Sequence, residues 1–262
     1  MNKYNIKQLV ERPKGTVVRI QPIEERLSSV KQYNVILNKL LRELAKETRE
    51  SVIPTFKADK QFRQDSDSWF TRLKAKADEL RRVASNMAND IFRLESKRHN
   101  KAFMQAAKRS LGIDLSAVVR EEDLENILSD YADRNASLIK SLSDDVVKRV
   151  EQAVYSAKIS GKSATQLSKD LQKQFGIASK RADLIAQDQL SKLNSDLNRT
   201  RQQQAGIQEY IWSTSKDERV RTRHKKLEGT TYKWGQQTKA EEGLPPGQPI
   251  RCRCIAVAQV TF

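Results

Sequence analysis

Apolar residues recur at helical spacing through most of the first 205 residues. The clearest run alternates three and four residues apart, at Phe70, Leu73, Ala77, Leu80, Ala84, Met87, Ile91 and Leu94. This spacing places the side chains on one face of an α-helix, in the a and d positions of a heptad. It predicts a long helix that Asp67 or Ser68 caps. Its apolar stripe is suited to pack on another helix of the chain, on a partner subunit or on DNA.

A second helix is predicted from about residue 23 to residue 53, with Pro54 ending it, because apolar residues recur at Leu27, Val30, Leu37, Leu41 and Leu44. Residues 23–134 are therefore predicted to form a long-helix body. Residues 1–22 are predicted to form an extended N-terminal arm, punctuated by prolines and a glycine. Within the arm, the run Thr16-Val17-Val18 is suited to pair at a strand edge.

Further helices are predicted between residues 112 and 206. Gly112 ends the long helix, and Glu121 and Glu122 begin the next, where acidic residues favour the positive end of the helix dipole. That helix continues to about Ile159, with a break expected around Asp133 to Ser137. After Gly161, one helix is predicted from Ser163 or Thr165 to Gly176, and another from Ser179 to Gln204, closed by Gly206.

The pattern changes after Gly206 from helical spacing to short runs that favour strands. Strands are predicted at Glu209–Trp212, Thr230–Trp234 and Arg251–Val260, with a basic helix or loop at Asp217–Leu227. The predicted fold is mainly α, an elongated helical body with a small C-terminal α+β domain that begins at about residue 207. Trp212 and Trp234 are expected to form the core of this cap.

Composition adds a strong positive charge. Lysine and arginine number 49 against 33 acidic residues, which gives a net charge of +16 over 262 residues. Such an excess favours polyanionic surroundings, with nucleic acid contacted through its phosphates, although a solvated surface is the alternative. The basic residues are spread along the chain, which argues against a sequence-specific DNA reader with a single recognition helix.

The sequence predicts a protein of the cytoplasm with no membrane partner. It lacks an apolar run long enough for a membrane span, and residues 1–13 lack the apolar run of a secretory signal. Only two cysteines are present, Cys252 and Cys254, which excludes a disulfide framework.

A candidate zinc site combines His224, Cys252 and Cys254, with Asp217 as a fourth ligand. If the last strand includes both cysteines, their thiols point to the same face because they are two residues apart. The alternative is that both are small buried apolar residues and that the protein has no cofactor.

Asp217 and His224 also suggest a metal-dependent nuclease, with Arg219 and Arg221 beside them. One carboxylate and one histidine among many basic residues are too few acids for a two-metal site. In the structural alternative, Asp217 caps a short helix and His224 forms a hydrogen bond. The phosphate-loop, nucleophile-elbow and zinc-protease motifs are all lacking, which favours a structural protein over an enzyme.

The last half of the chain resembles a known family. The resemblance rests on the segment Tyr-Ile-Trp-Ser-Thr-Ser-Lys-Asp-Glu-Arg-Val-Arg at residues 210–221, followed by His224, Leu227 and Gly229, and on Pro-Gly-Gln-Pro-Ile-Arg-Cys-Arg-Cys at 246–254. Upstream, Arg-Ala-Asp-Leu-Ile-Ala-Gln-Asp-Gln at 181–189 and Asn-Ala-Ser-Leu-Ile at 135–139 are also similar. Residues 135–262 thus resemble the phage head morphogenesis domain, the phage Mu F-like minor head proteins. That family usually has an arginine where Gln187 stands.

The resemblance implies a minor capsid protein of a tailed phage. It would be incorporated with the portal protein during procapsid assembly, inside the head near the portal vertex, and would meet the major capsid or scaffolding protein. Non-specific contact with packaged DNA, or help in its packaging or ejection, is also implied. The family supplies no catalytic residues. Its motif residues here, Trp212, Asp217, Arg219, Arg221, His224, Gly229, Cys252 and Cys254, are expected to have structural roles. A host DNA-binding protein is the remaining alternative.

Overall fold

The computed structural model describes residues 4–58, 67–115 and 124–262, without the side chains of residues 67 and 68. Its contacts divide the chain into two compact units. The first unit contains residues 1–27, 92–128 and 187–262, and the second contains residues 28–91 and 129–186. Each unit therefore combines segments that lie far apart in the sequence.

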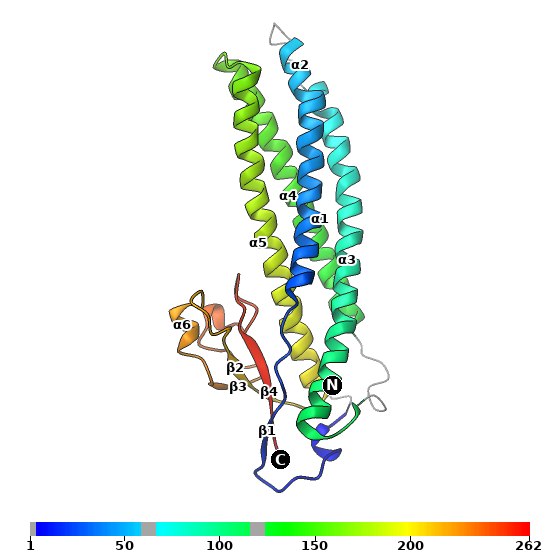
Figure 1. Ribbon diagram of the computed structural model, residues 1–262, viewed down its shortest axis with the longest axis vertical. Helices are drawn as coiled ribbons and strands as arrows, with labels where there is room; N and C mark the ends of the chain where they lie inside the picture. The colour runs from blue at the N-terminus through cyan, green and yellow to red at the C-terminus, as the bar shows by residue number, and fades with distance from the viewer. Residues whose placement is uncertain (1–3, 59–66, 116–123) are drawn as a thin grey trace. The chain divides into compact units, whose positions relative to one another are not determined.

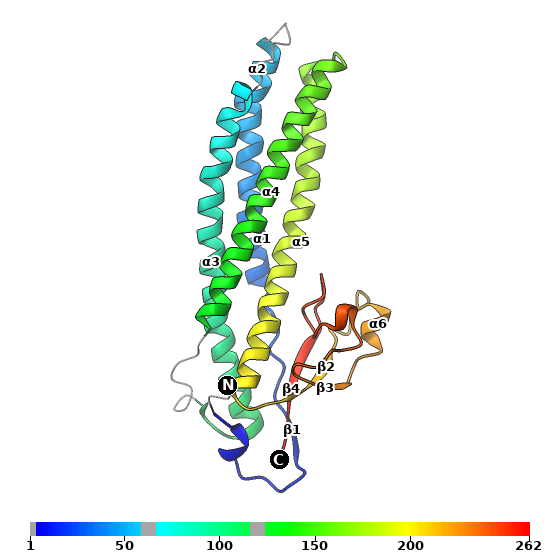
Figure 2. The same cartoon turned by 180° about the vertical axis from the view of Figure 1, so that it is seen from behind.

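The second unit is a helical bundle. It is formed by parts of α1 (Leu27–Glu47), α3 (Asp67–Leu111), α4 (Glu125–Ile159) and α5 (Ala164–Gln204), with α2 (Ile53–Ala58) following α1. The bundle segments lie side by side and alternate in direction (Figures 1 and 2). One face of each helix is buried, as the apolar spacing predicts, including Leu37, Leu40, Leu44, Phe70, Leu73, Leu142, Val146, Val150, Leu167 and Leu171.

The helix α4 runs without a break through Asp133–Ser137, so the prediction of a break there is wrong. Asn135 is fully buried within this stretch. Its Oδ1 accepts a hydrogen bond of 2.7 Å from the hydroxyl of Tyr33, and its Nδ2 donates to the carbonyl of Tyr131. The polar residue is therefore satisfied inside the bundle and does not interrupt the helix.

Pro54 does not end the second predicted helix. Between α1 and α2 lies a π-helical segment, Thr48–Val52, and Pro54 is the second residue of α2. The π segment inserts an additional residue into the turn, and the Ile53 N–H bonds to the Thr48 carbonyl. Because this widened turn accommodates the proline ring, the helical path continues to Ala58.

The predicted long helix around residues 70–94 is confirmed as part of α3, which ends at Leu111, next to Gly112. Its buried stripe differs from the predicted one near the middle. Met87 and Leu94 are exposed, whereas Ala88 and Phe92 are buried. A strict heptad has 3.5 residues per turn, and an α-helix has 3.6, so the buried face drifts away from the a and d positions along the helix.

The helix α5 is continuous through Gly176, so the predicted end at Gly176 and restart at Ser179 are both wrong. Apolar side chains before and after the glycine are buried, among them Leu171 and Ala178. Their packing outweighs the cost of one glycine, about 1 kcal/mol. The predicted start at Ser163 is confirmed, because the Ser163 hydroxyl accepts from the Gln166 N–H and the Gln166 side chain accepts from the Ser163 N–H.

The first unit contains a four-stranded antiparallel sheet in the order β1-β4-β2-β3 (Figures 1 and 2). Its strands are β1 (Val17–Arg19), β2 (Glu209–Ser213), β3 (Thr231–Lys233) and β4 (Ile255–Thr261). All three predicted C-terminal strands are present, and the predicted pairing of the N-terminal arm is confirmed by the register Val18↔Val260. The fold is thus mainly α with a small α+β part near the C-terminus.

The core of the first unit unites the N-terminal segment, α3, the residues that follow α5, and β4. Its buried members are Ile6, Ile20, Ile23, Phe103, Ala106, Ala107, Leu111, Leu115, Ala205, Ile207, Ala258 and Val260. The arm begins with a short 3-10 helix, Ile6–Gln8, whose Ile6 N–H bonds to the Ala205 carbonyl at the end of α5. The predicted helix start at Glu121 and Glu122 lies outside the described residues. Across the described part of the chain, no helix is long and apolar enough to cross a membrane.

Candidate functional site

The candidate site lies in the α+β part of the first unit, beside the sheet. A second small core gathers Trp212 of β2, Leu227, Ala240, Cys252 and Cys254, with Tyr232 of β3 packed against it. The short helix α6 (Thr222–Lys225) brings His224 to this core, and the segment from residue 235 to residue 254 brings the cysteines. Of the two tryptophans that the sequence assigns to the core of the cap, Trp212 is fully buried, whereas Trp234 is only partly buried and lies outside this core.

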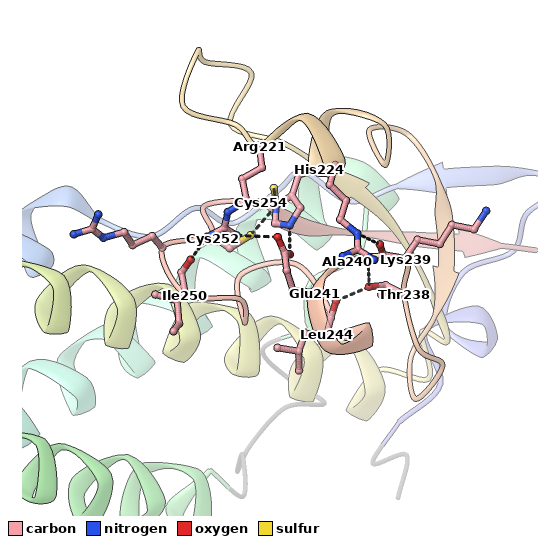
Figure 3. Close-up of polar contacts among 12 residues, drawn as sticks. Arg221, His224, Thr238, Lys239, Ala240, Glu241, Leu244, Ile250, Cys252 and Cys254 are labelled. Atoms are coloured by element: carbon pink, nitrogen blue, oxygen red, sulfur yellow. Dashed lines mark hydrogen bonds and ion pairs between the residues drawn. The ribbon is translucent and has the colours of Figure 1, made fainter.

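His224, Cys252 and Cys254 meet in this core, as Figure 3 shows. The Nδ1 atom of His224 lies 3.6 Å from the Sγ of Cys252 and 3.5 Å from the Sγ of Cys254. All three side chains are buried. The edge of the His224 ring also meets Trp212, with the ring centroids 5.2 Å apart. The sequence prediction that these three groups come together is therefore matched by the geometry.

The other ring nitrogen of His224 is bound by a carboxylate. Its Nε2 lies 2.6 Å from Oε2 of Glu241, a residue of the 3-10 helix Glu241–Gly243 (Figure 3). Although burial opposes it, the hydrogen bond with His224 and the nearby charge of Arg221 hold the pKa of Glu241 below its usual value. A carboxylate here keeps the Nε2 proton in place, which leaves Nδ1 facing the sulfurs without a proton when the ring is neutral.

The two thiols interact with each other as well as with the histidine. The hydrogen bond between them lowers the pKa of Cys252 and raises that of Cys254, because one sulfur carries the shared proton more readily than the other. The Gly247 N–H donates to the Cys252 sulfur over 3.4 Å.

Both cysteines precede β4 instead of lying within it, so the prediction of a strand that begins at Arg251 is wrong at its start. Arg251 has a positive φ of 58°, and the Cys252 N–H bonds to the Pro249 carbonyl. This turn, and not the alternation of a strand, brings both sulfurs to one side. Left-handed backbone at a residue other than glycine is uncommon and marks a local constraint.

Asp217, the fourth ligand in the sequence prediction, lies outside the cluster of His224 and the two cysteines. Its carboxylate binds the guanidinium of Arg253 at 2.8 Å and 2.6 Å and accepts from the Arg219 N–H. Burial opposes the effect, but these contacts keep the pKa of Asp217 below its usual value. Arg253, the residue between the two cysteines, thus orients Asp217.

The remaining motif residues stabilise the loops around the cluster. Arg221 donates to the Ile250 carbonyl and forms an ion pair with Glu241 (Figure 3). Gly229 has a φ of +76°, and its N–H bonds to the Trp212 carbonyl. Arg219 is exposed. Arg221 and Gly229 therefore make contacts within the fold.

A cavity of about 430 Å³ adjoins the cluster. It is lined by both cysteines, by Asp217 and Arg253, and by residues of the arm and α5 that include Glu25 and Ser191. Glu25 accepts hydrogen bonds from the Gln187 amide and from the Ser191 hydroxyl. Burial raises the pKa of Glu25, which these hydrogen bonds only partly offset.

Sequence reasoning missed Glu241 and Glu25. Neither belongs to a recognisable motif, and each reaches its partner through the fold. The local sequence Lys-Ala-Glu-Glu-Gly at 239–243 gives no sign that Glu241 has a histidine partner. The only available signal was the resemblance itself, since the arginine usual at position 187 would need an acidic partner such as Glu25.

Comparison with known proteins bears on this half of the chain. Residues 148–257 match the family described as Phage Mu protein F like protein. An uncharacterized protein of Haemophilus influenzae is 31% identical over 175 residues, which cover 66% of this chain and 39% of the relative. The chain therefore spans about two fifths of the length of that relative. No solved structure matches.

The matched segment includes His224, Cys252 and Cys254, all of α5 and the strands β2 and β3. The resemblance inferred from the motifs is therefore confirmed by a match of residues 148–257 to the Phage Mu protein F like family.

Proposed function

We propose that the chain is a minor head protein of a tailed phage, incorporated with the portal protein during procapsid assembly. The observation that carries this proposal is the family match over residues 148–257, which contains the motif residues of the α+β part. In the described structure those residues hold a small core together. A role as an assembly component needs such a folded module and does not need a reaction centre.

Counting copies in purified particles tests this proposal. Quantitative mass spectrometry of virions and procapsids should detect the chain at a low copy number, in a fixed ratio to the portal protein. A host DNA-binding protein would instead stay in the soluble fraction of infected cells. If both particle types lacked the chain, the head assignment would be wrong.

A basic surface supports contact with packaged DNA. Near α6 the exposed basic residues include Arg219, Lys225, Lys226, Lys233 and Lys239. Among the described residues, none of these five forms an ion pair, so their charges are available to phosphates. Each phosphate contact releases counterions, which makes binding depend on salt but not on sequence.

The salt dependence of DNA binding tests this surface. Replacing Lys225 and Lys226 with glutamine should lower the slope of log affinity against log salt by about 2, because each phosphate contact contributes about 0.9. Lys140 and Lys148 on α4 are exposed and provide a matched control pair. An equal change in both double variants would show that only net charge matters and would remove the assigned surface.

The helices of residues 23–134 are proposed to contact the portal or the inner capsid wall. Within them Val83 and Met87 are exposed one turn apart on α3, at 51% and 42%. Apolar residues in this arrangement suit a helix that packs on another subunit. We assign the portal protein as the partner, since the family resemblance implies incorporation with it.

Co-purification with the portal protein of the same phage tests this contact. Val83→Ser with Met87→Ser should reduce capture at least tenfold. Ile159→Ser, at an exposed apolar position outside residues 23–134, should leave it unchanged. Normal capture of the double variant would contradict docking through this face. Point variants are preferred to deletions, because α1 and α3 belong to the core of the bundle.

The proposal treats the chain as a structural protein and not as a nuclease. Asp217 is bound by Arg253, and His224 is bound by Glu241 and faces the thiols, so both groups have structural partners. DNA cleavage assays with added divalent metals separate the two classes. Metal-dependent cleavage that disappears in His224→Ala would favour the enzyme.

A further inference from the structure

We propose that His224, Cys252 and Cys254 bind one zinc ion through Nδ1 and two thiolates, and that this ion links α6 to the segment before β4. A zinc ion accepts imidazole nitrogen and thiolate sulfur in one tetrahedral shell. The inference rests on the local geometry of the α+β part and is independent of the proposed role in the phage head.

The distances fit a shared ion. Zinc–sulfur bonds of about 2.3 Å and zinc–nitrogen bonds of about 2.05 Å at a tetrahedral angle place nitrogen and sulfur about 3.6 Å apart. The measured distances from His224 Nδ1 are 3.6 Å to Cys252 and 3.5 Å to Cys254. All three ligand atoms lie within 4.8 Å of one another. Binding therefore needs little rearrangement of the side chains.

The histidine is oriented as a metal ligand. The Oε2 atom of Glu241 accepts a hydrogen bond from the Nε2–H of His224 at 2.6 Å. The lone pair of Nδ1 therefore points toward the sulfurs. A carboxylate on the far nitrogen is the usual support of a metal-bound histidine, since it fixes the tautomer and raises the basicity of the ligand. The contact of the ring with Trp212 further restricts its rotation.

The surroundings of the sulfurs suit negative charge. The Gly247 N–H already donates to Cys252. The indole Nε1 of Trp212 is buried in the same core, and within the described residues it has no nitrogen or oxygen acceptor. A metal-bound thiolate is a stronger acceptor for this N–H than a neutral thiol, because the sulfur carries a negative charge.

The fourth coordination position is assigned to water from the adjoining cavity. Both cysteines line this cavity, which holds about 430 Å³. Asp217 also lines it, but its carboxylate is engaged by the guanidinium of Arg253. The ligand set of the protein is therefore three residues, without Asp217.

Cobalt substitution tests the proposal on the full chain. Untagged, reduced protein is freed of metal with a chelator and titrated with Co²⁺. We expect one cobalt per chain, with the thiolate-to-cobalt charge-transfer absorption and strong visible bands of a tetrahedral site. Zinc should displace the cobalt and abolish these bands. Absence of the bands from protein that circular dichroism shows to be folded would overturn the proposal.

Variants identify the ligands and guard against loss of folding. Cys252→Ser with Cys254→Ser should remove the charge-transfer absorption, and Asp217→Asn should retain it. Glu241→Gln changes a partly exposed side chain and should weaken metal affinity by about 10- to 100-fold while the protein stays folded. Undiminished affinity in Glu241→Gln, or loss of binding in Asp217→Asn, would contradict the assigned ligand set.

Discussion

The guanidinium of Arg201 on α5 donates from Nη1 to the Nδ1 of His99 on α3 across 2.6 Å. Both side chains are buried, with exposed fractions of 1% and 5%. Arg201 also donates to the Ser96 carbonyl at 2.9 Å. A buried cation thus joins two helices inside the first unit, and its neighbours depend on it for their hydrogen bonds.

Replacing Arg201 with methionine should destabilise the protein by about 2–4 kcal/mol, because His99 and the Ser96 carbonyl would lose a charged donor inside the core. Urea unfolding followed by circular dichroism measures the change. Arg199→Met is the matched control, since Arg199 forms a half-exposed ion pair with Asp196 and should cost less than about 1 kcal/mol. Equal effects of the two variants would refute the importance of the buried contact.

Stability should fall as the pH drops below 6.5, the ordinary pKa of histidine, in a way that depends on His99. Burial, and then the charge of Arg201, hold the pKa of His99 well below that value. The unfolded chain therefore binds a proton that the folded chain does not, and each pH unit removes up to about 1.4 kcal/mol of stability. Urea unfolding at pH 7.5, 6.5 and 5.5 covers the range in which this proton is bound. The free energy of unfolding should decline less steeply in His99→Gln than in the present chain. An identical slope in both proteins would contradict the explanation.

Replacing Gln187 with arginine should stabilise the protein at neutral pH by about 1–2 kcal/mol, because the guanidinium would face the partly buried carboxylate of Glu25. In the present chain burial raises the pKa of Glu25, so the folded state loses stability as the pH rises above the ordinary value of 4.5. Arg253 is the other charge that acts on this carboxylate. The arginine would lower the pKa of Glu25 and remove this loss.

The free energy of unfolding of Gln187→Arg, measured from pH 4.5, the ordinary pKa of Glu25, up to pH 7, tests this effect. Gln187→Met, which removes the hydrogen bond without adding charge, should be less stable than the present chain. If the arginine variant were the less stable of the two, Glu25 would not be accessible to a cation from position 187.

Two glycines should respond in opposite directions to alanine. Gly247 has a φ of +87°, and a Cβ there would lie 2.8 Å from the Cβ of Ser195, so Gly247→Ala should destabilise by about 1–3 kcal/mol. Gly176 lies within α5 and a Cβ would meet nothing within 4 Å, so Gly176→Ala should stabilise by up to about 1 kcal/mol. Thermal unfolding of both variants checks the contrast, and a shared sign would contradict it.

Sequence patterns predicted the elements well where one physical effect dominates. The long helix around residues 70–94, the helix start at Ser163 and the strand around Trp212 are local signals, and the structure has each of them. The predictions failed where packing decides. Gly176, Pro54 and Asn135 each favour a break locally, but buried neighbours or a π turn keep the helix intact.

The candidate site was predicted only in part. His224 and the two cysteines can be recognised as possible metal ligands by residue type alone, and they come together in the fold. The partners Glu241 and Arg253 could not be assigned to His224 and Asp217, because those contacts depend on loops whose path the sequence pattern does not fix.

The pairing of β1 with β4 has a consequence for the order of events during translation. The register Val17↔Thr261 joins two strands that lie far apart in the sequence. The strand β1 therefore remains without its neighbour until β4 has been synthesised, and contacts of such long sequence separation form slowly. Completion of this sheet edge is thus a late step in folding, after the helical hairpins have had time to collapse.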